Sequence, residues 1–173
     1  YSSPVHSALT MSIAFMIAGK EFKSTNPAAQ REIDRLKLNA IRRPITLDAK
    51  MQGGYYLEII WSVDRTTVAK INHLPYENVR LAVANDEDVI PGVYYSKDWN
   101  DMRKKKNAPV FIPMYNPTTK ADEPSQVLFV GIMTPGSAYY PKPDYYSAIN
   151  YIEITREISE FYRAFLSNGM APS

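Results

Sequence analysis

The sequence predicts an α+β fold with N-terminal helices, a mainly antiparallel sheet that forms a meander, and a long C-terminal helix. Three observations support this class. Apolar residues recur at helical spacing within 1–52, aromatic and β-branched segments typical of strands follow within 53–133, and helical spacing returns over 144–168. Helices and strands are thus segregated along the chain, which favours α+β over α/β. A length of 173 residues suits a single domain.

Two capping signals predict the first helices. Ser3 and Asn26 are each followed by proline, a combination that begins helices. Gly19 is expected to end the first helix and Pro44 the second, with a short third helical turn over 46–52. The residues at helical spacing are Val5, Leu9, Ile13 and Met16 in the first helix, and Ala29, Ile33, Leu36 and Ala40 in the second.

Short strands are expected after Gly53 and Gly54 break the helical pattern. Alternating polar and apolar residues over 53–96 indicate a meander with one face in solvent. The following stretch, 97–124, carries four prolines and is expected to be a loop with one short strand. The predicted strands are 55–63, 66–74, 78–83, 89–96, 110–114 and 126–133.

The longest predicted helix is 144–168. Asp144 is expected to cap its start, and the Asn-Gly pair at 168–169 is expected to end it. Its apolar and aromatic positions cover more of the circumference than one core-facing stripe requires, which indicates a second contact surface. We assign Ile152, Ile158 and Phe165 to a core-facing side, and Ile154 and Phe161 to the second surface.

Composition excludes several classes of chemistry. The absence of cysteine excludes disulfides, thiolate nucleophiles and cysteine-ligated zinc. A net charge of +2, from 20 basic and 18 acidic side chains, confines any nucleic-acid contact to a local patch. The most apolar run, 8–19, is shorter than the roughly 20 residues of a membrane span, so we expect no membrane partner.

A search for catalytic motifs predicts no enzyme. His6 and His73 lie in different predicted elements, and the sequence around them contains no pattern of a catalytic triad or of a set of metal ligands. The segment 131–137 has the glycine spacing of a phosphate loop without its lysine, and the acidic cluster 86–88 lacks the glycine of a calcium loop. We therefore predict no catalytic, metal-binding or cofactor-binding residues and no cofactors.

Two groups of residues are candidate contact sites. A basic run could bind DNA or a partner, although such runs are most often solvated loops. Thirteen tyrosines are many for this length, and tyrosine suits both interfaces and half-buried domain walls. The candidate DNA or partner contact is Arg103, Lys104, Lys105 and Lys106, and the candidate subunit interface is Tyr139, Tyr140, Tyr145, Tyr146, Ile154 and Phe161.

Three segments resemble a known family. They are SPVHSALTMSIAFMIAGKEF at 3–22, GGYYLEIIWS at 53–62 with KINHL at 70–74 and YYSKDW at 94–99, and the stretch 139–173, where a proline-aspartate helix is closed by an asparagine-glycine turn. Together they resemble the portal proteins of tailed bacteriophages, in the variant of phages and prophages of Bacteroides-like bacteria. The chain opens without methionine, and we expect it to be a piece of a longer protein covering the wing of a portal subunit.

The resemblance implies a structural role without catalytic residues. Portal subunits form a ring, usually of twelve copies, at one capsid vertex, through which double-stranded DNA is packaged and ejected. The implied partners are copies of the chain itself, terminase, capsid and tail adaptor proteins, and DNA contacted without sequence specificity. The implied location is the virion, and the host cytoplasm during assembly.

Two alternatives remain open from the sequence. One is an unrelated interaction or scaffold domain with a tyrosine-rich binding face. The other is an enzyme in which the basic run 103–106 holds a phosphate and a carboxylate acts as the base. The enzyme alternative requires polar groups that converge in a pocket, and a cleft surrounded by His73, Glu58 and the basic run would support it.

Overall fold

A computed structural model describes residues 3–118, 123–132 and 134–169. Residues 1–2, 119–122, 133 and 170–173, which belong to the ends of the chain, the predicted loop and the last predicted strand, lie outside the described residues. The α+β class is confirmed. The elements are α1 (Pro4–Ala18), α2 (Pro27–Arg35), α3 (Leu38–Gln52), β1 (Gly54–Trp61), β2 (Val68–Leu74), β3 (Val79–Leu81), β4 (Gly92–Tyr95), β5 (Val110–Pro113), β6 (Ser125–Gly131) and α4 (Ile149–Ser167), with 3-10 turns η1 (Tyr76–Asn78), η2 (Lys105–Asn107) and η3 (Tyr146–Ala148).

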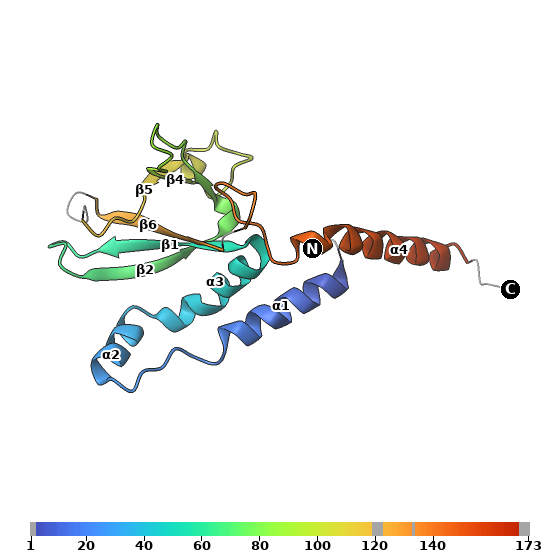
Figure 1. The fold of residues 1–173 in the computed structure, drawn as a ribbon, viewed down its shortest axis with the longest axis horizontal. Helices are drawn as coiled ribbons and strands as arrows, with labels where there is room; N and C mark the ends of the chain where they lie inside the picture. The colour runs from blue at the N-terminus through green and yellow to red at the C-terminus, as the bar shows by residue number, and fades with distance from the viewer. Residues whose placement is uncertain (1–2, 119–122, 133, 170–173) are drawn as a thin grey trace.

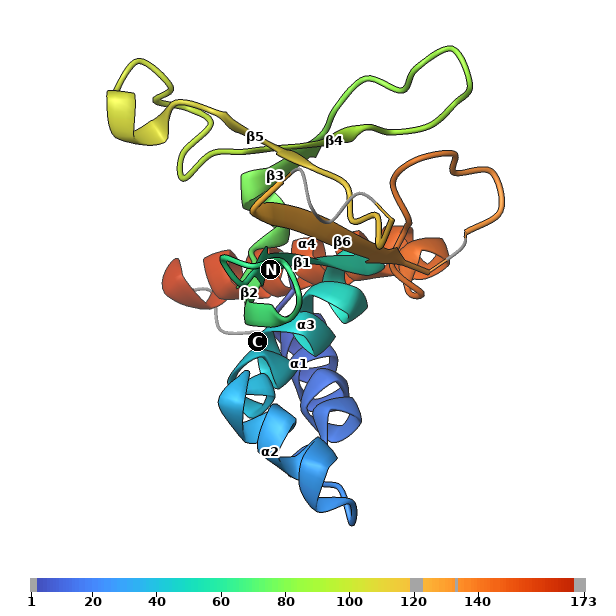
Figure 2. The same ribbon diagram turned by 90° about the vertical axis from the view of Figure 1, so that its left-hand side faces the viewer.

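The strands form two three-stranded antiparallel sheets stacked above the first three helices (Figures 1 and 2). One sheet has the order β2-β1-β6 and the other β3-β4-β5. The predicted continuous meander over 53–96 is therefore divided, because β1 pairs with the distant β6 and the chain leaves the first sheet between β2 and β3. Helix α3 packs on one face of the first sheet, and α1 packs on α3.

The core lies between the two sheets. Tyr56 of β1 stands opposite Leu74 of β2 and Phe129 of β6, so the three side chains share one face of the first sheet. The ring of Tyr56 stacks on that of Phe129 with 4.5 Å between their centroids. The second sheet and β6 complete the buried cluster with Val79, Val93, Ile112 and Val127.

The Ser-Pro and Asn-Pro signals predict the starts of α1 and α2 correctly, but the predicted end of the second helix is wrong. Ser3 and Asn26 accept hydrogen bonds from the backbone of His6 and Ala28, as expected of N-caps. The break after α2 comes at Lys37, and Pro44 lies inside α3. Pro44 is the seventh residue of α3, and because proline has no N–H, the helix loses one backbone hydrogen bond there. The packing of α3 against the first sheet outweighs the free-energy cost of this lost bond.

Lys37 adopts the left-handed conformation, with φ 53°, which a side chain with a Cβ disfavours. Replacing Lys37 with glycine is expected to raise the free energy of unfolding by about 0.5 to 1 kcal/mol, because relief of this strain outweighs the greater freedom of glycine in the unfolded chain. Urea unfolding followed by circular dichroism measures the change. Lys37→Ala is the matched control, since it retains the Cβ. An equal gain in both variants would contradict the backbone explanation.

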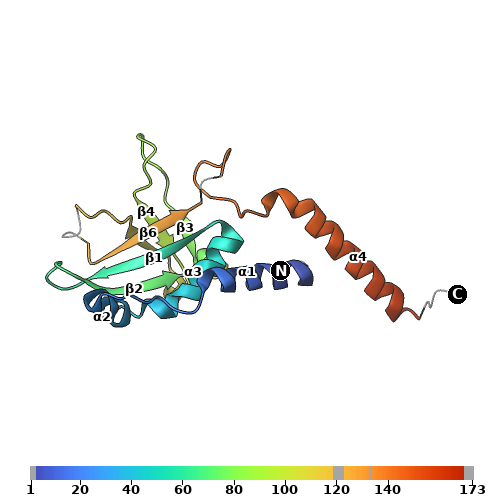
Figure 3. The same cartoon turned by 60° about the horizontal axis from the view of Figure 1, so that its bottom comes forward.

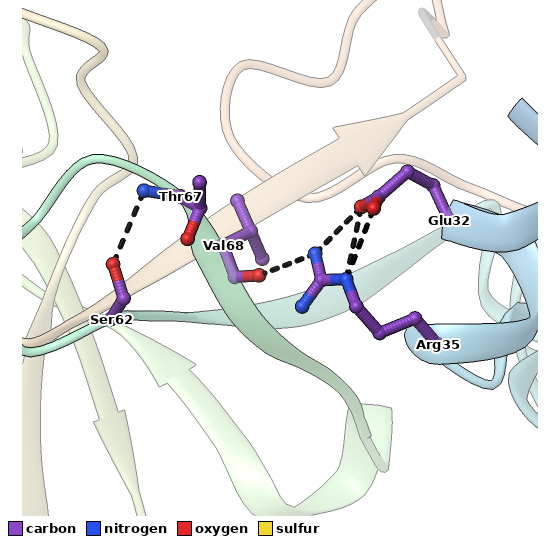
Figure 4. A network of polar contacts seen from close by, with 5 residues as sticks. All are labelled: Glu32, Arg35, Ser62, Thr67 and Val68. Atoms are coloured by element: carbon purple, nitrogen blue, oxygen red, sulfur yellow. Dashed lines mark hydrogen bonds and ion pairs between the residues drawn. The ribbon is translucent and has the colours of Figure 1, made fainter. Parts of the chain in front are cut away.

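Polar contacts tie the helical layer to the first sheet at α2 (Figure 4). Arg35 binds both carboxylate oxygens of Glu32, and the same guanidinium donates to the carbonyl oxygen of Val68 at the start of β2, with an N–O distance of 2.9 Å. This hydrogen-bonded ion pair lowers the pKa of Glu32. In the neighbouring turn, the backbone N–H of Thr67 donates to the hydroxyl of Ser62.

Arg42 of α3 closes the end of α1. Its side chain is buried and donates to the carbonyl oxygens of Ala18 and Gly19, at 3.3 Å and 2.7 Å. A cation at a helix C-terminus satisfies free carbonyl groups and interacts favourably with the helix dipole. The buried face of α1 consists of Thr10, Ala14 and Ala18, so α1 contacts the body of the chain through small side chains.

Candidate functional site

Helix α4 leaves the two-sheet body and projects away from it (Figures 1 and 3). The prediction that Asp144 caps this helix is wrong, because α4 begins at Ile149 after the 3-10 turn η3 and its N-cap position is Ala148. Asp144 forms an ion pair with Lys50 of α3. The carboxylate thus fastens the segment that leads into α4 to the body.

The segment before α4 is held against the end of α3 by further contacts. The hydroxyl of Tyr145 donates to the carbonyl oxygen of Met51 at 3.1 Å, and its ring meets the ring of His6 edge-on at 4.3 Å between centroids. The backbone of Lys142 approaches Gly53 so closely that a Cβ on this glycine would lie 2.5 Å from the carbonyl oxygen of Lys142. These contacts set the position from which α4 departs.

Gly53→Ala is expected to lower the free energy of unfolding by about 2 kcal/mol, because Gly53 has φ 79° and alanine adds both backbone strain and a collision with Lys142. Gly136→Ala is the matched control, since Gly136 has φ 76° and nothing lies within 4 Å of its added Cβ. Chemical unfolding of both variants separates strain from collision. Equal destabilisation of Gly53→Ala and Gly136→Ala would mean that the backbone of Lys142 does not collide with the added Cβ at position 53.

The apolar side of α4 faces away from the body. Ile158 is 50% exposed and Phe161 is 66% exposed, so the assignment of Ile158 to the core is wrong, while Ile152 and Phe165 are half-buried. At 3.6 residues per turn, Ile154, Ile158, Phe161 and Phe165 lie within an arc of about 60°. The predicted division of these residues between two sides is therefore wrong, and they form one outward surface.

The side of α4 that faces α1 is apolar in its first turn and polar beyond it. Ile149 and Ile152 line a pocket with His6 and Thr10 of α1. A further surface cavity is lined by Pro4 of α1 and by residues of α4 that carry charge or hydroxyl groups. Beyond its first turn, α4 therefore turns polar side chains toward its own domain and most of its apolar side chains away from it. The α4 residues lining this cavity are Arg156, Ser159, Glu160 and Arg163.

Helix α1 also carries an apolar outer face. Helical spacing groups these residues on one side of the helix but does not say whether that side faces the core or the solvent. Val5, Leu9 and Met16 are 61%, 57% and 71% exposed, and they lie opposite the small buried residues. The stripe at helical spacing therefore points away from the core. One signal in the sequence could have indicated this, since α1 has no charged residue and a helix that is apolar on all sides must be covered on all sides.

The predicted interface tyrosines are divided between two places. Tyr145 and Tyr146 stand at the start of α4, where the ammonium of Lys142 lies 4.3 Å from the centroid of the Tyr146 ring. Tyr140 accepts a hydrogen bond from the backbone N–H of Leu81, and Tyr139 donates to Asp88 at 3.2 Å. The hydrogen bond to Asp88 raises the pKa of Tyr139. These hydroxyl groups connect segments of the chain, while the rings of Tyr139, Tyr140 and Tyr146 stay exposed.

The basic run lies in the loop between β4 and β5, on the opposite side of the sheets from α3 (Figure 2). The side chains of Arg103, Lys104, Lys105 and Lys106 are all exposed. Buried Asn107 anchors the loop directly behind them, since its amide donates to the carbonyl of Asp101 and its own carbonyl accepts from the hydroxyl of Ser96 at 2.7 Å. The run is therefore displayed at the surface by an anchored loop.

The convergence required by the enzyme alternative is not found among His73, Glu58 and the basic run. Leu57 stands opposite His73 and Glu58 opposite Asn72, so His73 and Glu58 lie on different faces of the first sheet. His73 faces α3, where its Nε2 lies 2.7 Å from a carboxylate oxygen of Asp48. Across residues 3–118, 123–132 and 134–169, no group of three histidine or acidic side chains could hold a metal ion. In the same ranges, no helix has the length and apolarity to cross a membrane.

Comparison with known proteins gives matches in structure only. No protein-family model matches the chain, and no curated protein matches it. A chain in the neck of an empty gene transfer agent particle, determined with C6 symmetry, matches with a TM-score of 0.72 at 12% identity, over 99% of this chain and 45% of that chain. A chain in the neck of the native particle, determined with C12 symmetry, matches with a TM-score of 0.67 at 12% identity, over 96% of this chain and 42% of that chain.

A chain from the virion of the native gene transfer agent particle has a TM-score of 0.59 at 13% identity, over 99% of this chain and 42% of that chain. The present chain thus spans less than half the length of the chains it matches. At these identities the likeness establishes a common fold. Across nearly its whole length, the chain has a fold that occurs in the neck and virion of a gene transfer agent particle.

Proposed function

We propose that this chain is part of a structural subunit of a head-to-tail connector in a tailed phage or a related particle. In the finer form of the proposal, the subunit is a portal protein, the chain is a single wing-like domain, and twelve copies form the ring through which DNA passes. The observation that carries the proposal is the likeness to neck chains over 99% of this chain. The three sequence segments that resemble portal proteins support the same role.

The outward apolar surfaces support a role in assembly. Exposed apolar residues on both α1 and α4 leave the chain with surface that an isolated domain would bury. Ring subunits cover such surface with their neighbours. A portal subunit would also contact terminase, capsid and tail adaptor proteins, in the virion and in the host cytoplasm during assembly, and its role requires no catalytic residue or cofactor.

The proposal is tested on the full protein that contains these residues. We expect the full protein to sediment as a large ring and to show a central channel by electron microscopy, and antibody labelling should place it at one vertex of purified particles. The 173-residue chain alone should sediment as a monomer or small oligomer, because the rest of the subunit supplies part of the ring contact. A full protein that stays monomeric and is absent from particles would refute the proposed function.

We propose that the basic run contacts DNA in the connector. Its four exposed cations lie together at the surface of the loop between β4 and β5. Replacing Arg103, Lys104, Lys105 and Lys106 with glutamine should weaken binding of the assembled protein to double-stranded DNA of any sequence. The salt dependence should fall by roughly 0.9 in log–log slope for each phosphate that the protein no longer neutralises. Arg31→Gln with Lys70→Gln, which removes exposed charges elsewhere, is the control, and equal effects of the two sets would contradict a local DNA contact.

A further inference from the structure

We infer that the outer face of α1 in one copy packs against the apolar face of α4 in the neighbouring copy, so that the ring is closed by a head-to-tail contact between these two helices. The inference rests on the proposed ring-forming function and names the surfaces that meet. The outer face of α1 is defined here by Val5, Leu9, Ser12 and Met16, and the apolar face of α4 by Tyr151, Ile154, Ile158, Phe161 and Tyr162.

The outer face of α1 has the composition of an interface core. On a helix of 3.6 residues per turn, Val5, Leu9, Ser12 and Met16 fall within an arc of about 60°. This arc is opposite Thr10, Ala14 and Ala18, which are buried against the body. All four residues of the outer face are exposed, although α1 has no charged side chain to keep that face in water. Charge depletion and long flexible apolar side chains are typical of the buried centre of a protein interface.

The apolar face of α4 supplies a complementary ridge. Its five residues are exposed and span an arc of about 100° that is rich in aromatic rings. At 1.5 Å per residue, the 19 residues of α4 extend about 28 Å and the 15 residues of α1 about 22 Å, so the two faces can be covered over most of their length.

The two faces cannot cover each other within one copy. The side of α4 that meets α1 of the same copy is a different one: Ile152 lines a pocket with residues of α1, and Arg156 and Glu160 line the cavity beside Pro4. Arg156 lies 3.8 Å from Glu160, and both belong to this side. The apolar face of α4 therefore points away from its own α1, and a second molecule is required to bring the two faces together.

Charge at the margins favours the pairing of unlike helices. Basic residues outnumber acids at the C-terminal end of α1. The exposed Lys20 and Lys23 follow its last turn, with one exposed acid, Glu21, between them. The guanidinium of Arg43 lies 5.3 Å from the centroid of the Phe15 ring, which places its charge at the edge of α1.

The apolar face of α4 is bordered by the exposed acids Glu153 and Glu157, next to Phe161 on the helix circumference. A contact of α1 with α4 opposes these charges, whereas α1 with α1, or α4 with α4, would bring like charges together. Two different surfaces in contact form a heterologous interface, which generates a ring when the rotation closes.

Site-directed crosslinking tests the inference on the assembled full protein. The 173 residues contain no cysteine, so a single introduced thiol is unique within them, and any cysteine elsewhere in the protein is replaced by serine. Ser12→Cys on α1 and Ile158→Cys on α4 are introduced into separate copies with different tags, which are co-expressed and treated with a short bis-maleimide. We expect a crosslinked dimer that carries both tags.

The controls decide between contact modes. Ser12→Cys co-expressed with Ser159→Cys, whose thiol lies on the polar side of α4, should give no dimer with both tags. Two differently tagged copies of the same single variant, either Ser12→Cys or Ile158→Cys, should also give no crosslinked dimer. Dimers from Ser12→Cys alone or Ile158→Cys alone would show that like helices meet, and would overturn the inference. Rings without any crosslink would overturn it while leaving the proposed function intact, and a protein that forms no ring would overturn both.

Discussion

Replacing Tyr56 with alanine is expected to lower the free energy of unfolding by about 3 to 5 kcal/mol, a large part of the roughly 5 to 15 kcal/mol that stabilises a typical domain. Tyr56 is fully buried at the centre of the core between the two sheets. Its ring stacks on Phe129 and lies 5.0 Å, centroid to centroid, from the ring of Tyr76. Alanine would remove these contacts and leave a cavity that the two sheets cannot close by small shifts.

The conservative variant separates packing from hydrogen bonding at the same position. Within the described residues, the Tyr56 hydroxyl has no hydrogen-bond partner of ordinary geometry, and burial raises its pKa. Tyr56→Phe keeps the ring and is expected to change the free energy of unfolding by less than about 1 kcal/mol. Equilibrium unfolding in urea compares the variants. Destabilisation in Tyr56→Phe as large as that in Tyr56→Ala would show that the hydroxyl, and not the ring, stabilises the core.

Replacing Ile158 and Phe161 with aspartate is expected to abolish ring assembly of the full protein while leaving the fold of the chain intact. Both side chains are at least half exposed, so each substitution should change the free energy of unfolding by no more than about 0.5 kcal/mol. In a ring each aspartate would be buried at every subunit contact without a charged partner, which is strongly unfavourable.

Sedimentation velocity of the full protein measures the extent of assembly, and thermal unfolding of the 173-residue chain measures the fold. Ser167→Asp, on the opposite side of α4, is the matched control and should still assemble. If the double variant unfolds, then α4 packs on its own body through these residues. If it folds and assembles, the apolar face of α4 is not part of the ring contact.

Local chemistry explains which features could be predicted from the sequence. Ser3-Pro4 and Asn26-Pro27 begin α1 and α2 because a side-chain oxygen caps free N–H groups and proline has none to cap. The β-branched and aromatic segments form strands, and the described part of the four-proline stretch contains one short strand, β5. These outcomes depend on neighbours within a few residues, so one sequence is sufficient to predict them.

The break at Lys37 and the continuation of α3 through Pro44 could not be predicted, because packing against the sheet overrides local helix preference there. Asp144 similarly does not cap α4, which begins only after η3, and its carboxylate pairs with Lys50, a residue distant in sequence. The candidate contact residues were chosen from the sequence by residue type, as basic, tyrosine or apolar side chains. Their roles were not, since a tyrosine hydroxyl bonded to Leu81 and one bonded to a partner look alike in the sequence.

The sequence by itself therefore determined the α+β class and the starts of α1 and α2, since these follow from residue type and short-range spacing. Only the tertiary structure decided that the strands divide into two sheets, that Val5, Leu9 and Met16 point outward, and that α4 turns its apolar side away from the body. Helical periodicity shows that apolar residues share a face. It cannot show whether the surface that covers this face belongs to the same molecule or to its neighbour, because that depends on contacts between residues far apart in the chain or in another copy.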